Sequence, residues 1–169
     1  MFQEGEIIVH GGEGACRVES VCELNLTGSA KTYYVLQPLV REGRIYVPVD
    51  GMVFLRRVIS REEALRLIDE IPSIHVEGYC SGNLRKMDTL FHSLLDTHEC
   101  VDLIRLLMII YEKKRVYQES GRKIGSIDQK NMQRAEKLLF SEFSAALGIP
   151  MDEVADFIHQ RLAHDSVEA

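Results

Sequence analysis

The chain contains 169 residues, of which 46% are hydrophobic and 27% are charged, and it carries a formal net charge of −6. This composition is typical of a globular protein with a buried core, and it excludes a disordered acidic tail, a collagen-like fibre and a coiled rod. A net negative charge gives no global indication of nucleic-acid binding, and the sequence contains no tryptophan.

The first 58 residues have the pattern of short β-strands separated by turns. Strands are predicted at 6–10, 15–24, 32–36 and 44–49, and the segment is expected to contain four to five short strands in all. In the fourth strand Ile45, Val47 and Val49 alternate with other residues, which indicates one buried face. Pro48 cannot donate a ladder hydrogen bond, so this end of the strand is expected to be an edge or an exit from the sheet. The pattern predicts a small SH3- or Tudor-like barrel.

A cluster of glycines, Gly11, Gly12 and Gly14, lies between the first two predicted strands. A phosphate-binding loop would place such glycines before a helix, usually with a lysine following. Here a strand follows and no lysine is close in the sequence. We therefore predict a tight turn between strands.

At Ser60 the hydrophobic spacing changes to that of a helix. Ser60 and Glu63 have the spacing of a capping box, in which both side chains satisfy free N–H groups at a helix start. This helix is expected to end at Pro72. Further helices are predicted over 84–95 and 97–117, from a second capping box at Ser126 to Gly148, and from Pro150 onward.

These patterns predict an α+β fold, in which a small SH3/Tudor-like β-barrel is followed by an all-α bundle of four to five helices. The predicted units are the barrel at 1–58, a connecting helix at 59–72 and a helical domain at 73–169. An alternative boundary near Ser73 assigns the first helix to the barrel.

Nothing in the sequence indicates export or a membrane segment. The stretch from Met1 to Glu6 is acidic, unlike a signal peptide, and the longest apolar run, 106–111, is too short to span a bilayer. The four cysteines, at positions 16, 22, 80 and 100, form no Cys-x-x-Cys pair. We therefore expect a cytoplasmic protein with reduced thiols and no membrane partner.

No pattern of side chains indicates catalysis or metal binding. The six histidines include no His-x-x-x-His pair. A nucleophilic pair of Cys100 with a histidine stays an alternative, but no glycine-rich elbow or oxyanion motif accompanies it. Tyr33, Tyr34 and Tyr46 could line a cation-binding cage, although packing in the barrel is the simpler interpretation. We expect no enzymatic activity, no metal, no cofactor and no small-molecule substrate.

Positive charge is concentrated between Arg105 and Lys137. This window holds nine bases and four acids, a charge of +5, so the rest of the chain carries −11. A predicted loop at 119–121 is flanked by bases on both sides, namely Lys113, Lys114, Arg115, Arg122 and Lys123. Loop bases beside a helix start suit contacts to DNA phosphates without sequence readout. A basic helix end favoured by the helix dipole is the alternative interpretation.

Several segments occur together in a recognisable order and spacing. They are Glu4-Gly5-Glu6-Ile7-Ile8-Val9-His10, Gly14, Tyr33-Tyr34-Val35-Leu36, Val47-Pro48, Leu55-Arg56-Arg57-Val58-Ile59-Ser60 and, in the helical half, Ala135-Glu136-Lys137-Leu138-Leu139-Phe140-Ser141-Glu142-Phe143. Over roughly residues 5–162 the chain resembles the CarD family of bacterial transcription regulators. The amino-terminal module of that family is also the interaction module of transcription-repair coupling factor.

The resemblance implies a non-enzymatic factor that acts at promoters. In the family, the barrel binds the RNA polymerase β subunit, partly through a sheet edge. The helical domain contacts DNA at the upstream edge of the transcription bubble, where a tryptophan wedges into the minor groove beside bases that hold phosphates. The candidate polymerase-contacting residues are Leu24, Leu26, Arg44, Tyr46 and Pro48. The candidate residues for weak, largely non-specific contact with promoter DNA are Tyr79, Leu84, Arg85, Lys86, Lys113, Lys114, Arg115, Arg122 and Lys123.

The sequence departs from the family pattern on both surfaces. The wedge tryptophan corresponds to Leu84, or to Cys80 in a variant alignment, with Tyr79 as the nearest aromatic residue. Leucine can act as a wedge, but it offers less apolar contact area than tryptophan and has no indole N–H. Two family arginines that face the polymerase correspond to Leu24 and Tyr46, and Arg44 could compensate. An adaptor that binds another protein without touching DNA is the alternative hypothesis.

Overall fold

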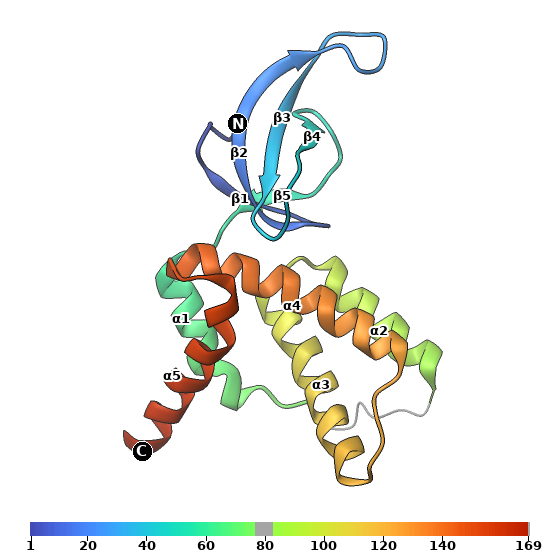
Figure 1. Cartoon of the computed structure of the whole chain (residues 1–169), viewed down its shortest axis with the longest axis vertical. Helices are drawn as coiled ribbons and strands as arrows, with labels where there is room; N and C mark the ends of the chain where they lie inside the picture. Colours follow the sequence, from blue (N-terminus) through green and yellow to red (C-terminus); the bar gives the residue numbers. More distant parts are fainter. Residues whose placement is uncertain (77–82, 169) are drawn as a thin grey trace.

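The computed structural model describes residues 1–76 and 83–168. Within these ranges an N-terminal antiparallel sheet is followed by five α-helices and two short 3-10 helices. Figure 1 shows the sheet standing on the helices, with the N-terminus in the sheet and the C-terminus at the far end of the bundle. The predicted α+β class is therefore confirmed.

Five antiparallel strands form one sheet in the order β4-β3-β2-β1-β5. They are β1 (Ile7–His10), β2 (Gly14–Leu24), β3 (Lys31–Pro38), β4 (Ile45–Pro48) and β5 (Leu55–Arg57). Pro48 ends an edge strand, where its missing N–H removes no ladder hydrogen bond, as predicted. The glycine cluster forms the β1–β2 turn, so its interpretation as a turn between strands is also confirmed.

The sheet bends around a small apolar core. A register shift between Val18 and Ser20 interrupts the pairing of β2 with β3, and such a bulge lets a long strand bend. The buried core of the sheet consists of Ile8, Cys16, Val18, Tyr34, Leu36 and Val47.

The helices begin and end largely where the sequence predicts. They are α1 (Arg61–Glu70), α2 (Leu84–Asp96), α3 (Cys100–Glu119), α4 (Ser126–Leu147) and α5 (Val154–Glu168), with the 3-10 helices η1 (Ile71–Ser73) and η2 (Met151–Glu153). Ser60 caps α1, and its Oγ accepts a hydrogen bond from the Glu63 N–H at 3.1 Å. The Glu63 carboxylate accepts from Arg66 instead of closing the capping box. No helix in the described ranges combines the length and apolar composition that a membrane crossing needs.

The prediction of a second capping box at Ser126 is wrong. The N-cap residue of α4 is Gly125, without a side-chain hydrogen bond, and Ser126 is the first residue of the helix. Asp128, in the same turn, points inward and forms an ion pair with Lys113 of α3, which fixes the start of α4 from inside the bundle. The helix ends at Gly148 as predicted, in a left-handed conformation with φ +69°.

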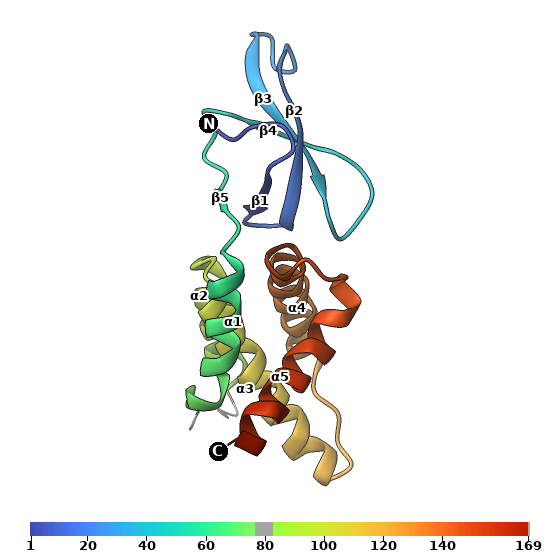
Figure 2. The same ribbon diagram turned by 90° about the vertical axis from the view of Figure 1, so that its left-hand side faces the viewer.

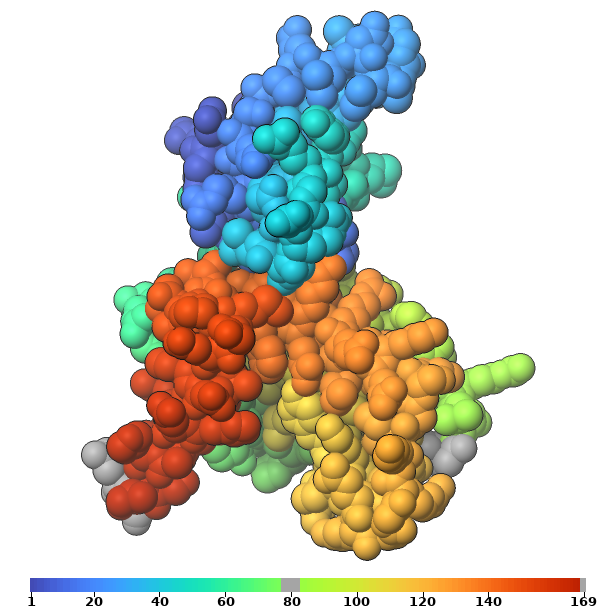
Figure 3. Space-filling view, in the orientation of Figure 1, coloured from blue at the N-terminus to red at the C-terminus, as the bar shows by residue number. Residues whose placement is uncertain are grey.

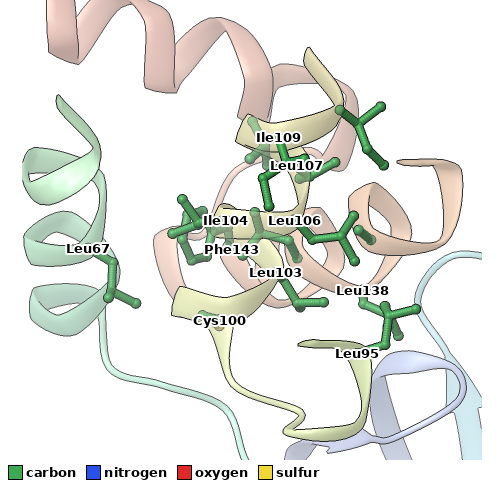
Figure 4. Packing of buried hydrophobic residues seen from close by; sticks show 14 of the residues in the cluster. Leu67, Leu95, Cys100, Leu103, Ile104, Leu106, Leu107, Ile109, Leu138 and Phe143 are labelled. Carbon is green, nitrogen blue, oxygen red and sulfur yellow. The ribbon is translucent and has the colours of Figure 1, made fainter. Parts of the chain in front are cut away.

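Helix α4 is the central element of the bundle. It lies beneath the sheet (Figures 1 and 2), and in Figure 1 α1 and α5 are on its left while α2 and α3 are on its right. Figure 4 shows the apolar core, to which α1 contributes Leu67, α2 contributes Leu95 and α4 contributes Phe143. Helix α1, predicted as a connecting segment, thus packs into the bundle against α4 and α5.

One buried ion pair joins the sheet to the bundle. Arg56 of β5 donates to both carboxylate oxygens of Glu142 in α4, at 2.5 and 2.8 Å, and to the backbone oxygen of His98 at 2.8 Å. The same carboxylate accepts from the Ile59 N–H and the Cys100 thiol, both at 3.1 Å. Only 1% of Glu142 is exposed. A charge buried this deeply is tolerated only because these donors replace water.

The β1–β2 turn packs directly on α4 beside this ion pair. The Ser141 Oγ accepts from the Ala15 N–H at 3.0 Å and donates to the backbone oxygen of Leu138 at 3.1 Å. Gly14 has φ +80°, and a Cβ atom there would lie 2.4 Å from the Ser141 Oγ, so the position requires glycine. The sheet and the bundle therefore meet in a closely packed polar interface.

We expect Glu142→Ala to lower the free energy of unfolding by about 3 kcal/mol, because the Arg56 charge and the Ile59 N–H lose their buried acceptor. Urea denaturation followed by circular dichroism measures the change. Glu112→Ala is the matched control, since Glu112 pairs with Arg115 on the exposed surface of α3. The control should leave the midpoint unchanged. Equal effects of the two variants would contradict the role of the junction.

Candidate functional site

The outer face of the sheet contains a hollow over strands β2, β3 and β4. Leu24, Val35 and Tyr46 are among the residues that line it. Val35 lies opposite Tyr46 in the β3–β4 pairing, so these two side chains share one face of the sheet. Tyr46 is 48% exposed, and Leu26, just beyond the end of β2, is 59% exposed. This face therefore presents accessible apolar side chains.

Arg44 adds a cation to the border of the hollow. Its Nε donates to the Glu19 carboxylate at 2.5 Å, and this hydrogen bond raises the pKa of Arg44. The Arg44 side chain is still mostly exposed, so a carboxylate on a partner can compete with Glu19. Pro48 lies two residues beyond Tyr46 and therefore on the same face of β4. The structure thus brings Leu24, Arg44 and Tyr46 to one hollow, with Pro48 on the same face of β4 and Leu26 just beyond the end of β2.

The free edge of β4 belongs to the same surface. Within the described ranges β4 pairs only with β3, so its other edge offers unpaired backbone groups. An edge of this kind can accept an added strand from a partner.

A second candidate surface lies in the bundle, away from the sheet, where the α3–α4 loop meets the start of α2 (Figure 1). Leu84, Arg122 and Lys123 line one depression with Ser126 and Ile127 from the first turn of α4. Leu84 is 60% exposed. An exposed leucine, two bases and a helix N-terminus are therefore brought together from distant parts of the chain.

Arg85 and Lys86 continue this surface along the first turn of α2. Both are exposed, and the Asn83 Oδ1 accepts hydrogen bonds from both of their backbone N–H groups. Cations are disfavoured at a helix N-terminus by the helix dipole, so neither side chain stabilises α2. Bases beside the positive end of a helix instead suit contact with an anion such as a phosphate.

The structure gives Lys113 an ion-pair partner inside the bundle. Its ammonium is buried, lies 2.7 Å from the Asp128 carboxylate and sits 5.5 Å from the centre of the Tyr117 ring. Lys113 therefore has a structural partner inside the bundle, and it also lines the depression that contains Leu84 and Arg122. Arg115 is exposed but is neutralised by ion pairs with Glu112 and Glu119 on its own helix.

Five of the nine bases in the positive window form no ion pair within the described residues, because Arg105, Lys113, Arg115 and Lys137 account for the ion pairs there. The five are Lys114, Arg122, Lys123, Lys130 and Arg134. The Arg122 guanidinium lies 4.7 Å from the centre of the Tyr117 ring, which holds it near the loop. Lys130 and Arg134 were missed as site candidates, although their spacing of four residues puts both on one face of α4.

The remaining predicted wedge positions, Tyr79 and Cys80, lie outside the described residues. Among the tyrosines, Tyr34 is buried in the sheet core and its hydroxyl accepts from the Phe2 N–H at 3.1 Å. It therefore points away from Tyr46, and the three tyrosines form no cation-binding cage.

The three described thiols are free, and two of them are buried. Cys16, Cys22 and Cys100 form no disulfide. Burial raises the pKa of Cys16 to about 11. The pKa of Cys100 is also raised above its usual value, mainly by burial and secondly by the negative charge of Glu142. In the part of the chain that the structure describes, no three His, Cys, Asp or Glu side chains converge as a metal site would require.

Residues 2–59 match the family model of the CarD-like/TRCF RID domain. The N-terminal sheet is a CarD-like RNA polymerase-interacting domain. We refer to it as the RID. The matched range contains all five strands of the RID and ends just before the Ser60 cap of α1, which confirms the resemblance predicted for this part of the chain. No curated protein matches the chain.

We expect Lys113→Gln to destabilise the bundle by about 3 kcal/mol, because it leaves the buried Asp128 carboxylate without its cation. Thermal unfolding followed by circular dichroism measures the loss. Lys123→Gln is the control, because Lys123 is exposed and unpaired within the described residues, and it should melt as the wild type does. A Lys113→Gln variant as stable as Lys123→Gln would show that the ion pair is not structural.

Proposed function

We propose that this protein is a non-enzymatic, cytoplasmic transcription regulator that binds the RNA polymerase β subunit through its RID. Its helical bundle then modulates the stability of the promoter open complex by touching upstream DNA. The observation that carries the proposal is the RID match over residues 2–59, on a sheet whose outer face presents the exposed residues expected for docking.

The chemistry of the RID face supports a protein partner. Leu24 and Tyr46 supply apolar contact area, and Arg44 supplies one cation for a carboxylate on the polymerase. The free edge of β4 allows backbone hydrogen bonds to an added strand. Apolar anchors give affinity, and the charge and the strand register give specificity.

The charge distribution supports DNA contact that depends on the polymerase. Only five of the nine bases in the positive window form no ion pair within the described residues, and the chain as a whole is acidic, so affinity for free DNA should be weak. Binding to the polymerase would hold the bundle beside the promoter at a high effective concentration. In that position Leu84 can insert between partly unstacked bases while Arg122 and Lys123 contact phosphates.

The Arg56–Glu142 junction supports a mechanical link between the two surfaces. Because it fixes the RID on α4, docking of the RID also sets the position of the start of α4. The DNA surface includes that start, so its placement follows from the polymerase contact without a separate recognition step.

The absence of enzymatic activity is part of the proposal and is supported by the thiols. Only a thiolate is an effective nucleophile, and the raised pKa values of Cys16 and Cys100 keep both thiols protonated near neutral pH.

An adaptor without DNA contact is the second candidate function. It is favoured by an apolar groove between α3, α4 and α5, which is lined by residues such as Leu107, Phe140 and Ile158. Figure 3 shows the surface hollowed between α5 and the end of α3.

We expect Tyr46→Glu to weaken binding of the full chain to core RNA polymerase by at least about tenfold, because it places a charge in the centre of the apolar face. Fluorescence anisotropy of labelled protein titrated with polymerase measures the affinity. Val167→Glu makes the same kind of change at an exposed apolar residue near the end of α5 and should bind as the wild type does. Equal affinity of Tyr46→Glu and wild type would rule out the RID face as the docking surface.

We expect the double variant Arg122→Gln/Lys123→Gln to shorten the lifetime of the promoter complex and to flatten its salt dependence. Two lost phosphate contacts reduce the slope of log K against log salt by roughly 2. Lifetimes measured by heparin challenge at several salt concentrations test this. The control Arg66→Gln/Arg161→Gln removes two ion-paired surface bases from α1 and α5 and should retain the wild-type slope. An unchanged slope in the first variant would favour the adaptor.

A further inference from the structure

The segment between β4 and β5 exposes an unusual run of apolar side chains. Met52, Val53 and Phe54 are consecutive, and all three are exposed, Met52 completely. This segment, coloured teal, projects from the side of the RID in Figures 1 and 3. Three adjacent exposed apolar residues are costly in water and indicate an interaction surface.

Both ends of the run are held in place. On one side the Gly51 N–H donates to the Pro48 backbone oxygen at 3.0 Å. A Cβ atom at Gly51 would lie 3.0 Å from that oxygen and 3.4 Å from the Pro48 Cβ, so Gly51 packs against the end of β4. On the other side the Phe54 backbone oxygen accepts from the Gly11 N–H, and the Phe54 ring stacks on His98 with centroids 4.2 Å apart.

These contacts account for the position of Phe54, but Met52 and Val53 remain without a comparable contact at the apex of a turn that is anchored on both sides. The stacking on His98 gives the Phe54 ring a partner at the junction with the bundle. Because both flanks are fixed, the apex is presented with little conformational freedom, which lowers the entropy cost of binding. We refer to Met52 and Val53 as the apolar knob.

We propose that the apolar knob is a further part of the polymerase-docking surface and inserts into an apolar pocket of RNA polymerase beside the segment bound by β4. This inference rests on the proposed function, because it extends the same interface. Consecutive Cα atoms are about 3.8 Å apart, so Met52 follows directly on the Gly51 that packs against Pro48. The knob thus follows closely on the end of β4, the strand that carries Tyr46 and Pro48.

The composition of the segment selects a protein partner over DNA. Residues 48–54 contain one charged residue, Asp50, and no base. A carboxylate beside the knob repels phosphates, so contact with a nucleic-acid backbone is disfavoured. An unbranched methionine beside a valine suits an irregular apolar pocket in a polypeptide.

The size of the knob argues against a second copy of this chain as its partner. A stable protein interface buries at least about 1,200 Å² in total, far more than two side chains supply. As an extension of a larger polymerase interface, the knob needs no such area of its own. Its contribution then resembles that of an anchor at the border of an existing surface.

The test compares the full-length double variant Met52→Ser/Val53→Ser with the wild type in titrations against core RNA polymerase. We expect the affinity to fall about tenfold, with the far-ultraviolet circular dichroism and the melting temperature unchanged. The matched control Val116→Ser/Val167→Ser removes two exposed valines from the bundle and should bind as the wild type does. If the double variant fails to fold, the single variant Met52→Asp carries the same expectation.

The possible outcomes separate this inference from the proposed function. Unchanged affinity in the knob variant, with affinity lost in Tyr46→Glu, would overturn the knob and leave the RID face intact. Failure of the wild type to bind polymerase would overturn both. A change in the sedimentation of the free chain on mutation of the knob would identify a self-association surface and would also overturn the inference.

Discussion

The arrangement of this protein depends on one buried charge. Glu142 lies on the central helix of the bundle, yet its donors come from three places: the last strand of the RID, the segment leading into α1, and the start of α3. An isolated buried carboxylate is very costly, so the carboxylate and its donors must be assembled together. The pair therefore makes the position of the sheet on the bundle specific, in a way that apolar packing alone would not.

This junction connects two surfaces of opposite chemistry. The RID face combines apolar side chains such as Leu24 and Tyr46 with charged ones, including Arg17 and Arg44, beside a free strand edge, which suits a polypeptide. The bundle surface combines bases with two helix N-termini and one exposed leucine, which suits a distorted duplex. Neither surface is extensive, and the acidic remainder of the chain opposes independent DNA binding. We infer that the two surfaces act together, because the junction holds each of them at a fixed position relative to the other.

The sequence predicts the elements of the fold well because their signals are local. Alternation in β4, the Ser60 cap and the left-handed Gly148 depend on neighbouring residues only. The Arg56–Glu142 junction depends on contacts between residues that are distant in the sequence. The same is true of whether each basic side chain is paired or free, and hydrophobic periodicity predicts neither. Lys113 looked like part of a basic loop, and only the fold shows that Asp128 neutralises it. The exposure of Met52 likewise could not be predicted from the sequence, because an apolar residue in a turn can equally well be buried in the core.

The central claim is that the RID places the bundle on promoter DNA, and hydroxyl-radical footprinting of promoter-bound polymerase tests it most directly. The footprint would be compared without the protein, with the wild type and with Tyr46→Glu. We expect added protection of sugars at the upstream edge of the bubble with the wild type, and none with Tyr46→Glu. Equal protection by Tyr46→Glu, or no added protection by wild-type protein shown to be bound to the polymerase, would contradict it.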